Sequence, residues 1–241
     1  MLSPNGINTI LFDFDGTLRH NKPLASDFFT DYVLGQGHPI SMDDRLRSAR
    51  WEHYYWASSP ELQADIDMFK DESEEFWCKY AYRRLIVLGL NMNVAEEFAP
   101  EVCQYMTDFY EREDIVPLEL PEVLGMFQEA GYRLGVVSNR DKPYWEELVS
   151  LDLCPFFEFS LAAGEVLSWK PDPGIFQAAL DRLDSSATQT LYVGDNYFAD
   201  VVGARRAGLR PVLYDPKGIF HEPGCPMIAS FEDLIGVVKE I

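Results

Sequence analysis

The feature that most constrains the fold is the short apolar run Ile10-Leu11-Phe12, which is followed at once by two acidic residues, Asp13 and Asp15. A short apolar run bounded by Gly16 is typical of a buried parallel strand that turns sharply at its end. Ligands of open α/β sheets bind at the carboxyl ends of the strands. Two carboxylates so close together repel each other unless a cation holds both ionised. The run therefore indicates a metal-binding site, and an Asx turn that merely closes the strand is the alternative.

Residues 20–112 have a helical pattern without the alternation that marks strands. Ser41 and Asn93 are placed to cap helices. Apolar residues recur at helical spacing in two stripes, Trp77, Ala81, Leu85 and Leu88 in the first, and Val94, Phe98, Val102, Met106 and Phe109 in the second. We therefore predict an all-helical domain at 20–112, inserted into a core domain formed by residues 1–19 and 113–241.

From Ile115 onward, strand-like and helix-like segments alternate along the chain. The predicted strands lie at 134–137, near 157–162, at 191–193 and at 211–214, and helices are expected at 142–150 and elsewhere between them. This alternation implies right-handed crossovers and a parallel sheet covered on both faces. The predicted fold class is α/β, with a Rossmann-like three-layer α/β/α core and the inserted all-α domain.

Further polar residues stand where other strands end. Ser138 and Asn139 follow one strand, Asp195 and Asp200 follow another, and Lys170 lies in a loop. The carboxyl ends of parallel strands share one edge of a sheet, so these side chains would converge on one crevice. The set suits a hard cation such as Mg²⁺, with Lys170 and Ser138 left to bind an anion. Taken singly, Ser138 could cap a helix, Lys170 could be a solvated charge, and Asp200 could complement a helix dipole.

The charge balance limits the partners. The chain has 20 basic and 40 acidic residues, a net charge of −20, which argues against nucleic acid and anionic membranes. An anionic substrate would need a metal ion or fixed cations in the site. The four cysteines are far apart in the sequence and show no metal-type spacing, so free thiols in a reducing compartment are expected. With no secretory leader or membrane-spanning stretch, we expect a cytoplasmic protein, monomeric or homodimeric.

Four short motifs carry a resemblance to a known family: Asp13-Phe-Asp-Gly-Thr-Leu18, the apolar strand ending in Ser138-Asn139, Lys170-Pro171, and Gly194-Asp195 with Asp200. In order and spacing they resemble the four motifs of the haloacid dehalogenase-like (HAD) hydrolase superfamily. The helical insert resembles the α-helical cap that this superfamily carries between its first two motifs. The resemblance implies a Mg²⁺-dependent phosphatase that acts on a small soluble phosphate ester.

The resemblance also implies roles for individual residues. Asp13 would be the nucleophile that forms an aspartyl-phosphate, and Asp15 the general acid and then the general base. Thr17 would orient the loop and Asp15. Because dehalogenases of the superfamily lack a carboxylate at the position of Asp15, dehalogenation is improbable.

The metal and phosphate ligands follow from the same resemblance. Mg²⁺ would be held by the carboxylates of Asp13 and Asp195 and by the backbone carbonyl of Asp15, and Asp200 would support this shell or join it through water. The transferred phosphoryl group would be bound by Lys170, by the loop residues Ser138, Asn139 and Thr17, and by backbone N–H groups.

The substrate is left open by the sequence. A dense cluster of Trp51, His53, Tyr54, Tyr55 and Trp56 either lines a substrate pocket or forms helix-packing core. Arg19 and His20 are placed to touch a leaving group, and Arg140 to reach a phosphate, the substrate or solvent. A phosphomutase with the same nucleophile and a non-catalytic sensor of phospho-ligands are the alternative functions.

Overall fold

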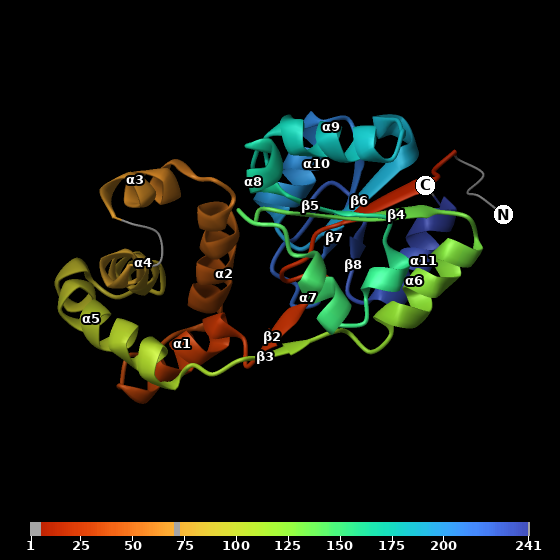
Figure 1. The fold of residues 1–241 in the computed structure, drawn as a ribbon. Coiled ribbons are helices and arrows are strands. Elements are labelled where there is room, and N and C mark those ends of the chain that lie inside the picture. Colours follow the sequence, from red (N-terminus) through yellow and green to blue (C-terminus); the bar gives the residue numbers. More distant parts are fainter. Residues whose placement is uncertain (1–5, 70–72, 241) are drawn as a thin grey trace. The chain divides into compact units, whose positions relative to one another are not determined.

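The computed structural model describes residues 6–69 and 73–240. The chain forms two compact units, one from Met1–His20 and Ile115–Ile241 and the other from Asn21–Asp114 (Figure 1). We call them the core unit and the helical unit. That the helical unit serves as a cap stays a prediction.

The core unit contains a parallel sheet. Its strands are β1 (Thr9–Phe12), β4 (Arg133–Ser138), β5 (Ser160–Ala162), β6 (Thr190–Gly194), β7 (Arg210–Tyr214) and β8 (Met227–Ile228), in the order β5-β4-β1-β6-β7-β8. Every neighbouring pair is parallel. The predicted α/β fold with a parallel sheet is confirmed, and the short edge strand β8 is an addition to it.

The strand order creates a reversal point beside β1. Leu11 of β1 pairs with Gly135 of β4 on one side and with Tyr192 of β6 on the other. The chain builds outward through β4 and β5 and then returns to the far side of β1 to add β6, β7 and β8. In sheets of this kind the crevice for a ligand opens where the order reverses, at the carboxyl ends of the strands. The residues that follow β1 and β6 therefore face this crevice.

Helices cover both faces of the sheet (Figure 1). One face packs against α6 (Leu120–Glu129), α7 (Trp145–Ser150) and α11 (Phe231–Glu240), and the other against α9 (Pro173–Arg182) and α10 (Val202–Arg206), with the short α8 (Ala163–Val166) beside α9. Side chains alternate along β1, so Ile10 and Phe12 join the first layer and Leu11 joins the second. Because both faces of the sheet are buried, the strand sequences are continuous apolar runs.

Helix α7 is shorter than predicted. We expected a helix at 142–150, but it begins at Trp145. Pro143 disfavours the helical conformation of Lys142, and Tyr144 is itself non-helical, with φ −132° and ψ 23°.

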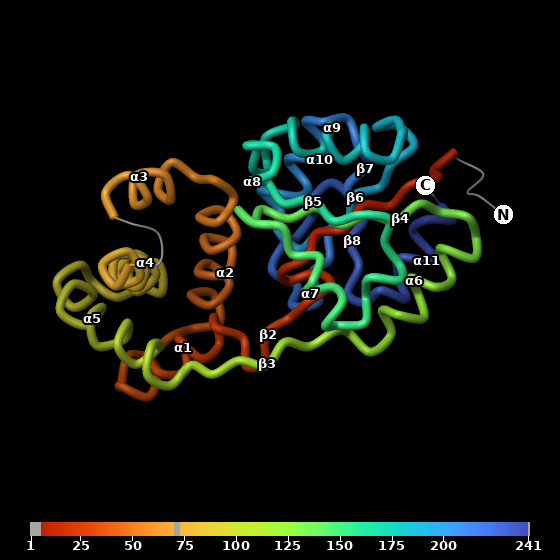
Figure 2. The backbone as a smooth tube through the Cα atoms, in the orientation of Figure 1, coloured from red at the N-terminus to blue at the C-terminus, as the bar shows by residue number. Residues whose placement is uncertain are grey.

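The helical unit contains α1 (Ala25–Gly35), α2 (Met42–Trp56), α3 (Pro60–Met68), α4 (Glu74–Val87) and α5 (Met92–Phe109) within its described residues (Figure 2). Ser41 caps α2, as predicted: its hydroxyl accepts a hydrogen bond from the N–H of Asp44. The prediction that Asn93 caps α5 is wrong. Asn91 is the cap and accepts from the N–H of Val94, because Asn91 is still extended and Asn93 already lies in the first helical turn.

The two apolar stripes are buried in part. Ala81, Leu85 and Leu88 pack with Phe98 and Val102 in one hydrophobic cluster. One end of each stripe projects to the surface: Trp77 is 41% exposed and Phe109 is 62% exposed. Phe76 and Tyr80 are buried on α4 beside Ala81 and Leu85, so the buried face of this helix is wider than the predicted stripe and leaves out Trp77.

The aromatic cluster on α2 is divided between core and surface, with Tyr55 buried and Trp56 39% exposed. Tyr55 is fully buried and donates a hydrogen bond from its hydroxyl to Asp65 of α3. Its ring lies 5.0 Å from that of Trp51 and 5.4 Å from that of Tyr80. For Tyr55, the packing alternative is therefore the right one.

Residues 20–22 differ from the prediction, which placed them at the start of the helical insert. They form β2 (His20–Lys22), which is paired with β3 (Glu113–Ile115) in a sheet of two strands. The chain passes from one unit to the other within these strands. None of the described helices is both long enough and apolar enough to cross a membrane.

Candidate active site

Lys170 joins two acidic residues at the carboxyl edge of the sheet. Its ammonium Nζ lies 2.6 Å from Oδ1 of Asp13, which follows β1, and 2.7 Å from Oδ1 of Asp200. Lys170, Asp13 and Asp200 are all buried. The negative charges of the two aspartates raise the pKa of Lys170 although its burial alone would lower it. The lysine is therefore a fixed positive charge in direct contact with the predicted nucleophile.

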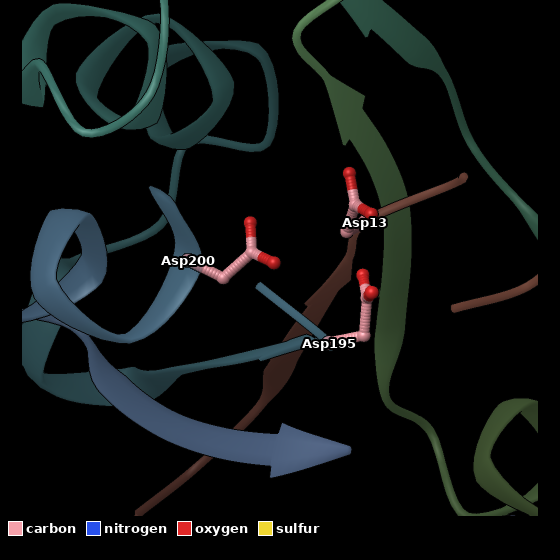
Figure 3. A group of neighbouring side chains, drawn as sticks. All are labelled: Asp13, Asp195 and Asp200. Carbon is pink, nitrogen blue, oxygen red and sulfur yellow. The ribbon is translucent and has the colours of Figure 1, made fainter. Parts of the chain in front are cut away.

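Asp195 completes a group of three carboxylates. It follows Gly194 at the end of β6, and one carboxylate oxygen from each of Asp13, Asp195 and Asp200 lies within 4.8 Å of the others. Figure 3 shows the three side chains coming from separate segments and gathering in one place.

Two glycines make room for this group. At Gly16 φ is +88°, a conformation that favours glycine, and a Cβ there would lie 2.5 Å from Oδ2 of Asp195. A Cβ on Gly194 would overlap the carboxylate of Asp200. The glycine of the Asp-Gly pair and the glycine before Asp195 thus allow the backbone to approach the carboxylates.

The electrostatics of the group favour a divalent cation. Burial raises the pKa of Asp13 to about 7, in spite of the neighbouring Lys170. Burial and the charges of Asp13 and Asp200 also raise the pKa of Asp195 well above its ordinary value. Three carboxylates, two of them buried and that of Asp195 partly buried, leave an excess of two negative charges beside one ammonium when all are ionised. Closely spaced carboxylate oxygens are the donors that hard cations prefer, so the residues fit a metal ion such as Mg²⁺.

Asp200 is oriented by the turn that carries it. The segment η3 (Tyr197–Val201) is one turn of π-helix before α10, a local form that is frequent at functional sites. Asn196 begins this turn: its side chain accepts from the N–H groups of Phe198 and Ala199, and its own N–H donates to Oδ2 of Asp200. The other carboxylate oxygen of Asp200 is left to contact Lys170.

Asn139 positions Lys170 through the backbone. Its Nδ2 donates to the carbonyl of Lys170 at 2.9 Å, and its Oδ1 accepts from the N–H of Lys170 at 2.6 Å. The structure thus shows Asn139 holding the backbone of Lys170, and its binding of phosphate stays a prediction. The side chain of Lys170 is held in turn by Tyr192, whose hydroxyl lies 2.9 Å from Nζ.

Thr17 and Ser138 both lie at this edge. The hydroxyl of Thr17 accepts a hydrogen bond from the N–H of Asp195 at 3.0 Å and lies within 3.4 Å of a carboxylate oxygen of Asp13. Its contacts are therefore with these two aspartates rather than with Asp15. Ser138 is the buried last residue of β4, next to β1.

Asp15 has different surroundings from Asp13. Its side chain is 38% exposed and accepts two hydrogen bonds from Arg140, from Nε at 2.7 Å and from Nη2 at 3.0 Å. Arg19 forms a further ion pair with it. Burial alone would raise the pKa of Asp15, but the two arginines outweigh this effect and hold the pKa below its ordinary value. The surroundings thus lower the pKa of Asp15, whereas they raise the pKa of Asp13 to about 7.

Sequence reasoning did not find the roles of Tyr192 and Glu147. Tyr192 lies in the apolar run of β6, where nothing in the sequence separates it from a core residue. Glu147 of α7 forms ion pairs with both Arg140 and Arg19. The only sequence signal for this network was the presence of Arg19 and Arg140 directly after two of the four motifs.

Comparison with known proteins shows the family to which this chain is similar. Residues 7–208 match the family described as haloacid dehalogenase-like hydrolase. The ribulose-1,5-bisphosphate 5-phosphatase of Halopiger xanaduensis is 33% identical over 86% of this chain and 84% of its own length. A glyceraldehyde 3-phosphate phosphatase of Pyrococcus abyssi is 33% identical, but only over 39% of this chain and 40% of that one.

The fold is shared with solved structures. The putative HAD-hydrolase YfnB from Bacillus subtilis, described as bound to magnesium, aligns over 96% of this chain and 98% of its own, with a TM-score of 0.57 and 20% identity. Together with the match over residues 7–208, these likenesses identify the chain as a member of the haloacid dehalogenase-like hydrolase family.

Proposed function

We propose that this protein is a Mg²⁺-dependent phosphatase that hydrolyses a small phosphate monoester through an aspartyl-phosphate on Asp13. The observation that carries the proposal is the contact of Lys170 with Asp13 and Asp200, beside Asp195. Phosphatase names among the relatives support the reaction class. The substrate is a small soluble ester, and a monomeric or homodimeric state in the cytoplasm stays a prediction of the sequence.

Asp13 acts as the nucleophile. One of its carboxylate oxygens attacks phosphorus, a P–O bond forms, and the bond from phosphorus to the ester oxygen breaks. Lys170 stabilises the charge on the transferred phosphoryl oxygens, and Ser138 and Thr17 contribute hydrogen bonds at the same edge. Water then attacks phosphorus, which releases inorganic phosphate and restores the carboxylate.

Asp15 moves the protons. It donates a proton to the oxygen of the leaving alcohol and takes one from the attacking water in the second step. In the structure Asp15 is paired with Arg140 and Arg19, so at least one of these contacts must loosen when it acts as an acid.

Asp13, Asp195 and the backbone carbonyl of Asp15 would hold Mg²⁺, with Asp200 beside them. The ion supplies positive charge that keeps the carboxylates ionised and offsets the charge of the phosphate. Without such charge an anionic ester would be repelled by three carboxylates in a protein of net charge −20.

The test is turnover of p-nitrophenyl phosphate, with and without Mg²⁺, by the wild type and by Asp13→Asn. We expect release of inorganic phosphate only with Mg²⁺ and only by the wild type. Asp181→Asn is a matched control, because it removes an equal charge from the exposed surface of α9. If the wild type and Asp13→Asn are equally inert across a panel of metabolite phosphates, the sensor is favoured. An isomerised sugar phosphate without free phosphate would favour the phosphomutase.

A further inference from the structure

Four charged side chains form a compact network next to the catalytic strand end. Arg140 forms a bidentate pair with the carboxylate of Asp15, with distances of 2.7 and 3.0 Å. Arg19 pairs with the same carboxylate, and its Nη1 lies 3.8 Å from Glu147. Arg140 also pairs with Glu147. The two arginines therefore share two carboxylates, and the network is electrically balanced.

The guanidinium groups are fixed by more than their ion pairs. Arg140 lies over the ring of Phe14 at 5.0 Å and over that of Tyr144 at 5.3 Å, and Arg19 lies over Phe14 at 5.5 Å. The rings of Phe14 and Tyr144 stack on each other, 5.0 Å apart. Aromatic faces attract guanidinium groups and limit their movement. The arginines are therefore expected to stay in place when Asp15 moves.

The pairing of Asp15 is not the arrangement that the reaction needs. To reach the oxygen of a leaving group, the Asp15 carboxylate must give up contacts with Arg140. The side chains of Arg140 and Arg19 are only 23% and 7% exposed, so solvent replaces a lost carboxylate poorly. The two arginines would then share the single carboxylate of Glu147, and buried charge that is only partly compensated is unfavourable. Another anion at the same position would remove this penalty.

We propose that the substrate supplies this anion. A carboxylate or a second phosphate on the leaving alcohol takes the place of Asp15 on Nε and Nη2 of Arg140, the pair of donors that we call the fork. The inference rests on the proposed phosphatase function and deepens it, because it names the class of substrate. The preferred substrates are phosphate esters whose alcohol carries a second negative charge close to the ester oxygen. Arg19 and Glu147 hold the fork in position, and the exchange frees Asp15 for proton transfer.

The chemistry of the fork supports an oxyanion as the exchanging group. The planar guanidinium presents two parallel N–H donors, which match the two oxygens of a carboxylate or of a phosphate. Asp15 already shows this geometry with Arg140. A neutral alcohol offers one oxygen without charge and cannot replace a carboxylate there. Only when Asp15 leaves does the guanidinium of Arg140 offer free donors to another anion, in a protein whose overall charge repels anions.

The test compares two esters that differ in one group: 2-phosphoglycolate, with a carboxylate, and 2-hydroxyethyl phosphate, with a hydroxyl. For the wild type we expect kcat/KM to be about 10- to 100-fold higher for the carboxylate ester, the range of a charge-assisted hydrogen-bonded pair. In Arg140→Met the preference should fall to about twofold or less. Arg140→Lys keeps the charge without the fork and should retain a small part of the preference.

Arg182→Met is the matched control. Arg182 also pairs with a carboxylate, that of Glu165, and lies over an aromatic ring, that of Phe159, but on a different part of the core unit. Its substitution should leave the preference between the two esters unchanged. Circular dichroism of each variant checks that the fold is retained.

The outcomes separate this inference from the proposed function. Equal kcat/KM for both esters in the wild type overturns the inference. An equal decrease in kcat/KM for both esters in Arg140→Met also overturns it, because Arg140 would then only position Asp15. If no ester and no p-nitrophenyl phosphate is hydrolysed, the proposed function fails. The inference is then decided by calorimetry on Asp13→Asn and on the double variant with Arg140→Met: a preference in binding that depends on Arg140 upholds it, and its absence overturns it.

Discussion

Replacing the predicted nucleophile should make the metal-free protein more stable. Asp13 is 6% exposed and lies among the carboxylates of Asp195 and Asp200, with Lys170 as the single ammonium in contact with it among the described residues. Burial raises its pKa to about 7 from an ordinary value of 3.8. Asn has nearly the same shape and carries no charge, so Asp13→Asn removes the cost of ionising this position.

The magnitude follows from the two pKa values. The folded protein holds the proton more tightly than the unfolded chain, so stability is lost as pH rises from about 4 to about 7 and is constant above that range. A difference of about 3 pKa units at 1.36 kcal/mol per unit gives about 4 kcal/mol. At pH 7.5 in a chelator, Asp13→Asn should be more stable than the wild type by about this amount, and near pH 4 the two should be close.

Thermal unfolding followed by circular dichroism measures the effect. A gain of about 4 kcal/mol corresponds to a midpoint higher by roughly 8–16 °C for a chain of this size. Asp181→Asn corrects for the general relief of negative charge, because Asp181 is exposed on α9. Mg²⁺ at pH 7.5 should raise the midpoint of the wild type and narrow its difference from Asp13→Asn, since the cation keeps Asp13 ionised at lower cost.

Two results would refute the reasoning. A wild-type protein that is as stable as Asp13→Asn at pH 7.5 in chelator would show that the buried carboxylate is ionised without penalty. A stability difference between the two proteins that is the same at pH 4 and pH 7.5 would show that its origin is not the ionisation of Asp13.

Three further substitutions test the residues that position Lys170 and Asp195. Asn139→Ala removes both hydrogen bonds to the backbone of Lys170 and should lower kcat for p-nitrophenyl phosphate by about 10²-fold, with a smaller change in KM; an unchanged kcat contradicts this role. Tyr192→Phe removes the hydroxyl that contacts Lys170 and should lower the free energy of unfolding in urea by about 1 kcal/mol, so a more stable variant would contradict it. Gly16→Ala places a Cβ at positive φ against Asp195, and should lower the unfolding temperature and abolish its increase with Mg²⁺; retention of the wild-type increase would show that Asp195 is not displaced.

Local sequence was sufficient where the structure depends on neighbours along the chain. The apolar run before Asp13 forms β1, and Ser41 begins α2 as expected. The gathering of Asp13, Lys170 and Asp195 could also be anticipated, because parallel strands place their carboxyl ends at one edge whatever their exact register.

Predictions failed where a shift of one or two residues decides the outcome. Asn91 and Asn93 both have the side chain of a helix cap, and only the backbone conformation shows that Asn91 serves as one. Similarly, Phe76 and Trp77 are both large and apolar, and the packing of α4 against α5 decides that Trp77 is the one exposed. Helical spacing alone does not distinguish adjacent faces that are both apolar.

The sequence by itself determined the class of fold and the identity of the acidic residues at the sheet edge, because both follow from apolar runs and the polar residues that end them. Only the tertiary structure decided which charges neutralise which. Arg140 meets Asp15 across 125 residues of chain, and Lys170 meets Asp13 across 157. Such pairs depend on the strand order and on side-chain direction, which set distances of a few ångströms between segments that are remote in the sequence.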